Sequence, residues 1–294
     1  MGYMFYIVDV FAEEKYAGNQ LAVFRNGDDI PSDEMQRIAK EMNYSETTFI
    51  LSDRERDGGY DVRIFTPEEE LPFAGHPTLG TAFVIQQEII KRPVDKVILN
   101  LGVGQIPVTF SYENGRTDIL WMKQKPPVFG KKIAKENIAR SLGLDGSAVD
   151  ERFPVQEVST GIPFLIVPLK SLAQVKKAKV DFVNFMKSVA DIEAKAPLVF
   201  CPEARREKND LSVRVFVDYY GIPEDPATGS ANGCLAGYLA KHHYFGQNKV
   251  DVRVEQGYEI GRPSLLYLRA EEKEQAVDVF VGGKTMLVAR GQFV

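Results

Sequence analysis

The sequence lacks several features that mark whole classes of protein. It has two cysteines, three histidines and one tryptophan among 294 residues. Two distant cysteines do not make a disulfide framework, so a reducing, cytoplasmic setting is expected. The opening stretch MGYMFYIVDV has no basic residue before its first acid, which is not typical of a signal peptide. No apolar run approaches the roughly 20 residues of a membrane span, so no membrane partner is expected.

The sequence also has no excess of basic residues over acidic ones. The chain carries 36 basic and 41 acidic residues, a net charge of -5. This balance does not indicate nucleic-acid binding. No histidine, cysteine and carboxylate set has the intervals of a metal site, so no metal is expected. The triplet GVG at 102–104 lacks the rest of a dinucleotide-binding loop, which leaves a nucleotide enzyme weakly supported.

What the sequence does contain is an alternation of strand-like and helix-like segments. The first helix shows an apolar stripe at helical spacing, and Ser32 is expected to cap it. The expected strands cover 4–11, 19–24, 46–51 and 60–65, and the expected helices cover 31–43, 76–90, 132–144, 179–195 and 230–243.

The second half of the chain resembles the first. Residues 60–85 and 211–239 both contain a Val-Arg-apolar-Phe strand, an acid-bearing loop with prolines, and a small-residue turn that opens an apolar helix. A looser similarity links the stretch before residue 24 with 158–169. A repeat of half the chain implies two lobes related by pseudo-symmetry.

The two apolar helices of the repeat are expected to be buried, because the first is small or apolar around most of its early turns and the second has no charge from Ala231 to Ala240. We therefore predict an α+β fold with two pseudo-symmetric lobes, each a mainly antiparallel β-sheet wrapped around a central helix. The N-terminal lobe is placed at 1–118 and the C-terminal lobe at 119–280. The return of the last strand, near 280–294, to the first lobe is left open.

Each of these helices begins at a turn with few side chains, AGHP in one and ATGS in the other. A helix N-terminus offers unpaired N–H groups and about half a positive charge, and glycine lets an anion approach them. Either turn alone is more often an ordinary cap, with Thr78 or Ser230 as a cap-type residue. Their matching places in a repeat favour a carboxylate site at Gly75 and Gly229.

Three polar residues lie next to these turns or before an expected strand. His76 and Asp225 each precede a proline, which holds them in extended backbone at the start of a helix. A lone histidine is more often structural than catalytic. The adjacent glycine turn makes a structural and a catalytic role for His76 about equally supported. Glu46 is most simply a solvated charge at a strand start. If it faces inward, it is a desolvated carboxylate with a raised pKa, suited to moving protons.

Five stretches together resemble the PhzF-like family of phenazine-biosynthesis proteins, in the family's order and over nearly the whole chain. They are NYSETTF, RIFTPEEELPFAGHPTLGTA, TGIPFLIVPL, GIPEDPATGSANGCLAGYL and QGYEIGRP. The resemblance implies the diaminopimelate epimerase fold, an active site in the cleft between two similar lobes, and a homodimer. It also implies a cofactor-free isomerase that shifts a proton on a small carboxylate, such as dihydro-3-hydroxyanthranilate or another amino or hydroxy acid.

The same resemblance implies a catalytic set and a substrate-binding set. In the catalytic set, Glu46 is the acid/base, and His76 and Asp225 bind and orient the substrate and tune Glu46. The substrate-binding set consists of Asn19, Gly75, Gly229 and Ser230. Gln20 stands where the family usually has proline, which affects only the turn after Asn19.

Thiol chemistry is not expected. Diaminopimelate epimerases use two cysteines, and the matching positions here hold Ala74 and Pro226. Cys201 and Cys234 lie elsewhere and are interpreted as small core residues. Arg262, in the stretch GRPS, either lies near an acid group or belongs to a strand-end turn. The alternative function is a family member that binds a metabolite or a protein partner without turnover.

Overall fold

The computed structural model describes residues 2–274 and 276–294. Contacts within the chain divide it into two compact units. Unit 1 contains the chain up to Met122 together with Gly282–Val294, and unit 2 contains Lys123–Val281. Within the described residues, no helix has the length and apolar character needed to cross a bilayer.

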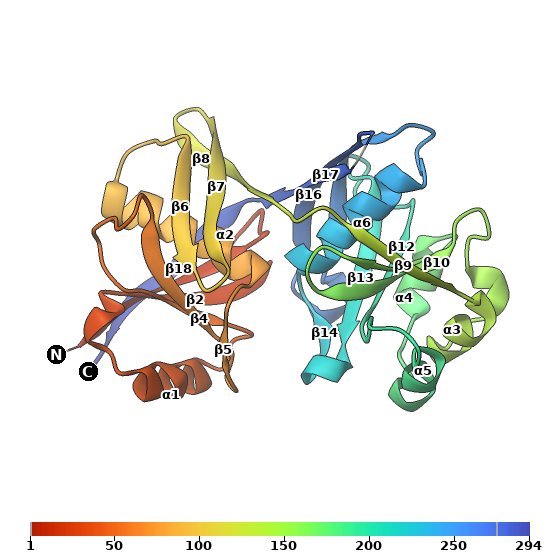
Figure 1. Ribbon diagram of the computed structural model, residues 1–294, viewed down its shortest axis with the longest axis horizontal. Helices are drawn as coiled ribbons and strands as arrows, with labels where there is room; N and C mark the ends of the chain where they lie inside the picture. Colours follow the sequence, from red (N-terminus) through yellow and green to blue (C-terminus); the bar gives the residue numbers. More distant parts are fainter. Residues whose placement is uncertain (1, 275) are drawn as a thin grey trace. The chain divides into compact units, whose positions relative to one another are not determined.

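Unit 1 is a strongly twisted sheet with a helix inside it (Figure 1). Its strands pair in the order β18-β1-β2-β3-β4-β6-β7-β8, with the short β5 added to β4. Its elements are β1 (Tyr3–Val10), β2 (Asn19–Arg25), η1 (Gly27–Asp29), α1 (Ser32–Met42), β3 (Thr47–Ile50), β4 (Tyr60–Phe65), β5 (Glu70–Leu71), α2 (Gly75–Val84), η2 (Ile85–Ile90), β6 (Lys96–Leu101), β7 (Gly104–Glu113), β8 (Arg116–Lys123) and β18 (Thr285–Phe293).

Unit 2 repeats this arrangement. Its strands pair in the order β9-β10-β11-β12-β13-β15-β16, with the short β14 added to β13. Its elements are β9 (Val128–Ile133), α3 (Lys135–Ser141), η3 (Gly146–Ala148), β10 (Val155–Ser159), β11 (Pro163–Pro168), α4 (Leu172–Lys177), α5 (Phe182–Ser188), β12 (Pro197–Cys201), β13 (Leu211–Val217), η4 (Asp218–Tyr220), β14 (Ile222–Asp225), α6 (Gly229–Lys241), β15 (Lys249–Gln256), η5 (Tyr258–Ile260), β16 (Ser264–Glu272) and β17 (Val277–Gly283).

The seven strands of the unit 2 order match the first seven of the unit 1 order, from β18 to β7. Parallel pairs occur at β2–β3 and β4–β6 in unit 1, and at the equivalent β11–β12 and β13–β15 in unit 2. The other pairs in these two orders are antiparallel. In each unit a short strand, β5 or β14, leads into the central helix. The pseudo-symmetric, mainly antiparallel fold predicted from the repeat is confirmed.

The central helix of each unit is buried, as its mainly small and apolar sequence predicts. In α2, every residue from His76 to Val84 is buried, and the helix contacts β1, β2, β3, β6, β7 and β18. In α6, every residue from Ala231 to Ala240 is buried against β10, β11, β15 and β16. A Cβ on Gly80 would lie 2.6 Å from a Leu21 methyl group, so glycine permits the close packing of α2 against the sheet.

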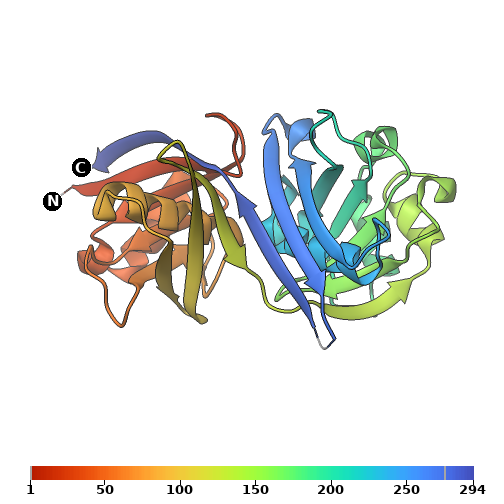
Figure 2. The same cartoon turned by 90° about the horizontal axis from the view of Figure 1, so that it is seen from above.

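The last strand returns to the first unit. β18 pairs antiparallel with β1 from Tyr3–Phe293 to Val10–Thr285. Figure 2 shows these two strands side by side, with the chain ends close together. Residues from both ends of the sequence therefore complete one sheet.

Several local predictions need correction. Pro31 rather than Ser32 occupies the N-cap of α1, and the Ser32 hydroxyl instead accepts a hydrogen bond of 2.9 Å from Arg63 Nη1. The helix predicted over 76–90 changes to a π-helix at Ile85, where Lys91 N–H bonds to the carbonyl of Gln86. The helices predicted over 132–144 and 179–195 are shorter, at Lys135–Ser141 and Phe182–Ser188.

Candidate active site

In unit 1, Glu46 and His76 form a close and largely buried pair. Glu46 directly precedes β3, and its side chain is 17% exposed, so it faces inward rather than into solvent. Its Oε2 atom lies 3.5 Å from Nε2 of His76, whose side chain is 6% exposed at the start of α2. The structure thus brings together two of the three residues expected to be catalytic.

His76 is neutral at physiological pH. Burial lowers its pKa to about 3, which outweighs a hydrogen bond to the backbone of Gln20 that favours the protonated ring. The contact with Glu46 is therefore not an ion pair at neutral pH. Because Nε2 has no hydrogen-bond partner among the described residues, the bond to Gln20 engages Nδ1. Nδ1 then carries the proton, and the Nε2 lone pair faces Glu46.

This burial predicts a specific dependence of stability on pH. An unfolded chain binds a proton on His76 below about pH 6.5, whereas the folded chain binds it only near pH 3. The unfolded state therefore gains protons as the pH falls through this window, and the folded state loses stability. We expect His76 to contribute about 3 kcal/mol to the fall in unfolding free energy between pH 7 and pH 4.5.

The variant His76→Asn should show a correspondingly shallower fall. Urea unfolding at several pH values, followed by circular dichroism, measures both slopes. Parallel curves for wild type and variant would contradict the neutral, buried state of the ring.

The start of α2 has no conventional cap. Ala74 occupies the N-cap in extended backbone and has no side chain that can accept from the first-turn N–H groups. The Thr78 hydroxyl, which the sequence offered as a cap, donates instead to the Ala74 carbonyl at 2.7 Å. Neither Ala74 nor Thr78 therefore caps the N–H groups of Gly75 and His76 through a side chain.

In unit 2, a buried polar network holds Asp225 against the start of α6. Thr228 occupies the N-cap, but its hydroxyl donates to Asp225 Oδ2 at 2.5 Å instead of capping the helix. The buried Gln256 side chain donates to the Asp225 carbonyl at 2.8 Å and accepts from Asn232 Nδ2 at 2.8 Å. Asn232 also donates to the carbonyl of Thr228. These hydrogen bonds therefore hold Asp225 in a fixed position relative to the start of α6.

The network depends on a close turn after β15. Gly257 has φ 77°, and a Cβ there would lie 2.5 Å from the carbonyl oxygen of Pro226. Glycine thus allows the backbone of this turn to approach the backbone of Pro226, just before α6. Arg262 closes the turn by donating its N–H to the Gly257 carbonyl, as the strand-end interpretation expects. A role for its side chain in binding an acid group stays a prediction.

The remaining predicted residues are divided between the units. Asn19 is buried at the start of β2, where its backbone lies opposite Val10 of β1 in the antiparallel pair. Ser230 is half-buried in the first turn of α6, and its carbonyl accepts from the Thr160 hydroxyl at 3.5 Å. Unit 1 contains Asn19, Glu46, Gly75 and His76, and unit 2 contains Asp225, Gly229 and Ser230.

A pair of side chains that the sequence reasoning missed occurs once in each unit. In unit 1, Arg63 on β4 makes a two-bonded contact with Glu70 on β5, at 2.7 and 2.6 Å. In unit 2, Arg214 on β13 makes the same contact with Glu224 on β14, at 3.0 and 2.7 Å. The arginines were visible in the repeated Val-Arg-apolar-Phe strands. Their partners were not, because the spacing from arginine to glutamate differs between the copies.

These Arg–Glu pairs fix the short strands that lead to the central helices. Glu224 immediately precedes Asp225, so its bond to Arg214 holds the approach to α6. Arg214 also donates to the carbonyls of Val175 and Ala178, and its side chain and that of Glu224 are only 10% and 7% exposed. Two-bonded contacts of this kind restrict geometry as well as adding binding energy.

Both cysteines are core residues, as predicted. Cys201 ends β12 and Cys234 lies inside α6, and both are buried. Burial raises the pKa of each thiol to about 11. Very little thiolate is therefore present at neutral pH, which does not suit a nucleophile or a proton carrier.

Comparison with known proteins identifies the family. Residues 8–291 match the model of the family described as phenazine biosynthesis-like protein, PhzC-PhzF. The chain belongs to this family. The match covers nearly the whole chain, so it includes both units and the candidate site residues in each.

Several named relatives of the chain are isomerases. The trans-2,3-dihydro-3-hydroxyanthranilate isomerase of Pseudomonas aeruginosa is 37% identical over 289 residues, which cover 97% of this chain and 97% of that protein. The isomerase of the same name from Pseudomonas fluorescens is 36% identical over 291 residues, covering 98% of each. The chain is accordingly an isomerase of the PhzF type.

The fold agrees with this assignment. The crystal structure of a Bacillus anthracis phenazine biosynthesis protein of the PhzF family aligns with a TM-score of 0.91 and 27% sequence identity. The alignment covers 100% of this chain and 99% of that one. The family resemblance stated from the sequence motifs is confirmed.

Proposed function

We propose that the protein is a cofactor-independent isomerase that shifts a proton between carbons of a small carboxylate, with Glu46 as the acid/base. The observation that carries this proposal is the buried contact between Glu46 and a neutral His76. The activity for which these two relatives are named supports trans-2,3-dihydro-3-hydroxyanthranilate, or a similar cyclic amino acid, as the substrate.

The proposed reaction uses one carboxylate in both directions. Glu46 removes a proton from one substrate carbon, the double bond moves, and the protonated Glu46 returns a proton to another carbon. One C–H bond breaks and one forms, so no electrons enter or leave the substrate. The Nε2 lone pair of His76 can accept a hydrogen bond from protonated Glu46, which stabilises the intermediate state of the carboxyl group.

The proposed binding groups are the two helix starts. The N–H groups near Gly75 and Gly229 bind the substrate carboxylate, with Ser230 and Asn19 as further polar contacts. Asp225, held by its Thr228 contact, orients a polar group of the substrate. The missing conventional caps at Ala74 and Thr228 support this assignment.

A ligand soak tests the binding groups. Crystals soaked with 3-hydroxyanthranilate, a stable aromatic relative of the proposed substrate, should show its carboxylate within hydrogen-bond distance of one of these helix starts. A carboxylate found only elsewhere, with these N–H groups bonded to protein atoms, would contradict the proposal.

The buried cysteines lead to the prediction that the isomerase does not use thiol groups in its reaction. We expect the double variant Cys201→Ala, Cys234→Ala to keep its isomerase rate within about threefold, apart from a loss of stability due to two small cavities. Native wild-type protein should also react slowly with a thiol reagent at pH 7.5, and quickly after unfolding in urea. Loss of all activity in a folded double variant would restore a thiol mechanism.

We also propose that the protein is a homodimer in a reducing, cytoplasmic setting, on the strength of the family resemblance and the two unpaired cysteines. Sedimentation equilibrium should give twice the chain mass of 32.9 kDa. A concentration-independent mass of one chain would contradict the dimer.

A further inference from the structure

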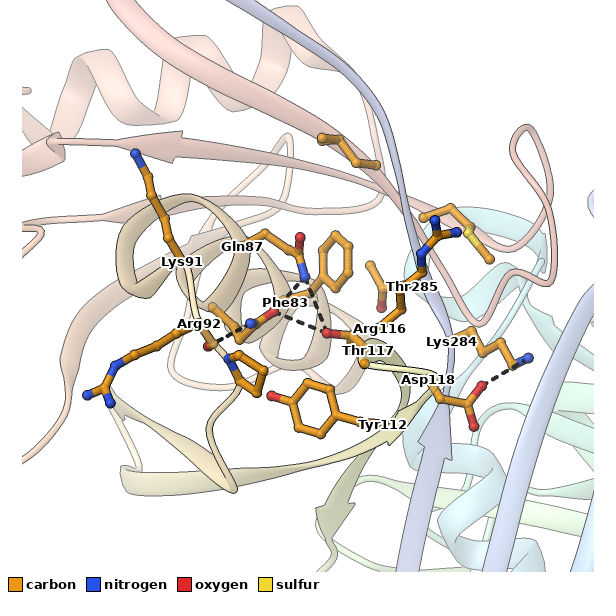
Figure 3. Close-up of a pocket in the computed structure, with 15 residues that line it drawn as sticks. Phe83, Gln87, Lys91, Arg92, Tyr112, Arg116, Thr117, Asp118, Lys284 and Thr285 are labelled. Atoms are coloured by element: carbon orange, nitrogen blue, oxygen red, sulfur yellow. Dashed lines mark hydrogen bonds and ion pairs between the residues drawn. The ribbon is translucent and has the colours of Figure 1, made fainter.

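Unit 1 contains a pocket whose lining includes none of the candidate catalytic residues (Figure 3). It lies at the far end of the central helix and is bounded by the end of α2, η2, the β7–β8 hairpin and the start of β18. Its volume is about 640 Å³. A pocket of this size accommodates a small organic molecule.

One wall of this pocket is an ordered polar network on the π-helix. Gln86 is buried, and its side chain donates to the Arg92 carbonyl at 2.9 Å and accepts from the Thr117 hydroxyl at 3.1 Å. Gln87 donates to Gln86 Oε1 at 2.6 Å. A dashed line in Figure 3 joins Gln87 to Thr117, where Gln87 Nε2 donates to the Thr117 hydroxyl at 3.3 Å. The wider turn of η2 is what places these two successive glutamines here, and such π-helical turns are frequent at functional sites.

The charges around the pocket favour an anion. Its lining includes four basic residues and one acid, Asp118. Lys284 lies 3.1 Å from Asp118 and is balanced by it. The other three, Lys91, Arg92 and Arg116, are exposed and form no ion pair within the described part of the chain.

The pocket also has an unsatisfied polar group and apolar walls. Thr285 is 6% exposed, and its hydroxyl has no hydrogen-bond partner among the described residues, although buried hydroxyls normally have one. The side chains of Phe83, Tyr112 and Met286 line the same space. The Tyr112 hydroxyl is already bonded to the backbone of Val94, so its ring presents a fixed wall.

We propose that this pocket binds a small aromatic carboxylate at a site separate from the candidate catalytic residues. The rings and the methionine contact the apolar body of the ligand. Arg116 and the lysine and arginine that follow η2 bind its carboxylate, and the Thr285 hydroxyl supplies a hydrogen bond. An inorganic anion fits the charges but leaves the apolar walls unused.

The pocket connects to the candidate site through a single helix. His76 lies in the first turn of α2, and Gln86 lies ten residues later at the start of η2. At 1.5 Å per residue, these two positions are about 15 Å apart along the helix. A ligand in this pocket therefore does not touch Glu46 or His76.

The test uses 4-bromobenzoate, because bromine can be located by its anomalous X-ray scattering. Wild-type crystals soaked with it should show bromine between η2 and the β7–β8 hairpin. Isothermal titration calorimetry should give a dissociation constant that rises about tenfold in Arg116→Glu and about threefold in Thr285→Val. The matched control, Arg140→Glu, reverses an exposed arginine in α3 of unit 2 and should bind as wild type does.

Three outcomes would overturn the inference. Bromine found only at the starts of α2 or α6 would show that the probe uses the candidate active site alone. Equal binding by wild type, Arg116→Glu and Thr285→Val would show that the pocket does not contribute. Equal affinity for inorganic phosphate would show a simple anion site without recognition of an aromatic body. None of these results bears on the proton-transfer role of Glu46, which is tested by activity.

Discussion

The variant Glu46→Gln is expected to lose about 100-fold or more of its isomerase rate while it still binds the substrate. Glutamine keeps the shape of the side chain but can neither accept nor return a proton. The buried contact with His76 can be retained, because the glutamine amide can donate to the Nε2 lone pair. The rate is measured by following substrate and product by NMR, and binding is measured by calorimetry.

The control for this experiment is Glu41→Gln, which removes an exposed carboxylate from α1 in the same unit. It should have the wild-type rate. We expect Asp225→Asn to differ from Glu46→Gln by weakening binding and rate together, because Asp225 is assigned to orientation. If folded Glu46→Gln isomerised the substrate at the wild-type rate, the proton role would pass to His76 or Asp225.

The largest expected effect on stability lies in unit 2. Glu224→Gln should lower the free energy of unfolding by about 3 kcal/mol, because the buried guanidinium of Arg214 loses its two-bonded carboxylate and keeps only the more distant Glu259, at 4.0 Å. The repeat supplies a matched control in Glu70→Gln. The Arg63 and Glu70 side chains are 27% and 43% exposed, so solvent screens their charges. This second change should cost at most about 1 kcal/mol.

Urea unfolding of both variants measures this difference. The two Arg–Glu contacts have nearly the same geometry, and they differ in burial and in the further partners of each arginine. Equal losses would contradict the assignment of the unit 2 contact as a desolvated charge pair. Because Glu224 precedes Asp225, we also expect Glu224→Gln to impair substrate binding more than Glu70→Gln does.

The fold was predictable because its main signals lie within short stretches of sequence. Two uniformly apolar helices, each after a small-residue turn, indicated a buried helix in each half, and α2 and α6 have this character. The change from α-helix to π-helix at Ile85 was not predictable, because the same kinds of residue occur in both types of helix. Ser32 was misjudged as a cap because its hydroxyl bonds to Arg63, a residue far along the chain.

The candidate site was predictable only in part. The direction of Glu46 could not be decided by alternation, since Thr47, Thr48 and Phe49 are all buried and β3 has no exposed face. The network around Asp225 was missed because Gln256 comes from a strand 31 residues later. One signal was available: Asn232 is a polar residue inside an apolar helix, and buried polar groups require partners.

Proton transfer by Glu46 is tested most directly by incubating wild type and Glu46→Gln with trans-2,3-dihydro-3-hydroxyanthranilate in deuterated water. We expect NMR to show wild type forming an isomerised product with deuterium at the newly protonated carbon, because the Glu46 proton exchanges with solvent. Glu46→Gln should bind the compound and leave it unchanged. Equal product formation by both proteins, or binding by wild type with neither isomerisation nor deuterium at carbon, would contradict the proposal.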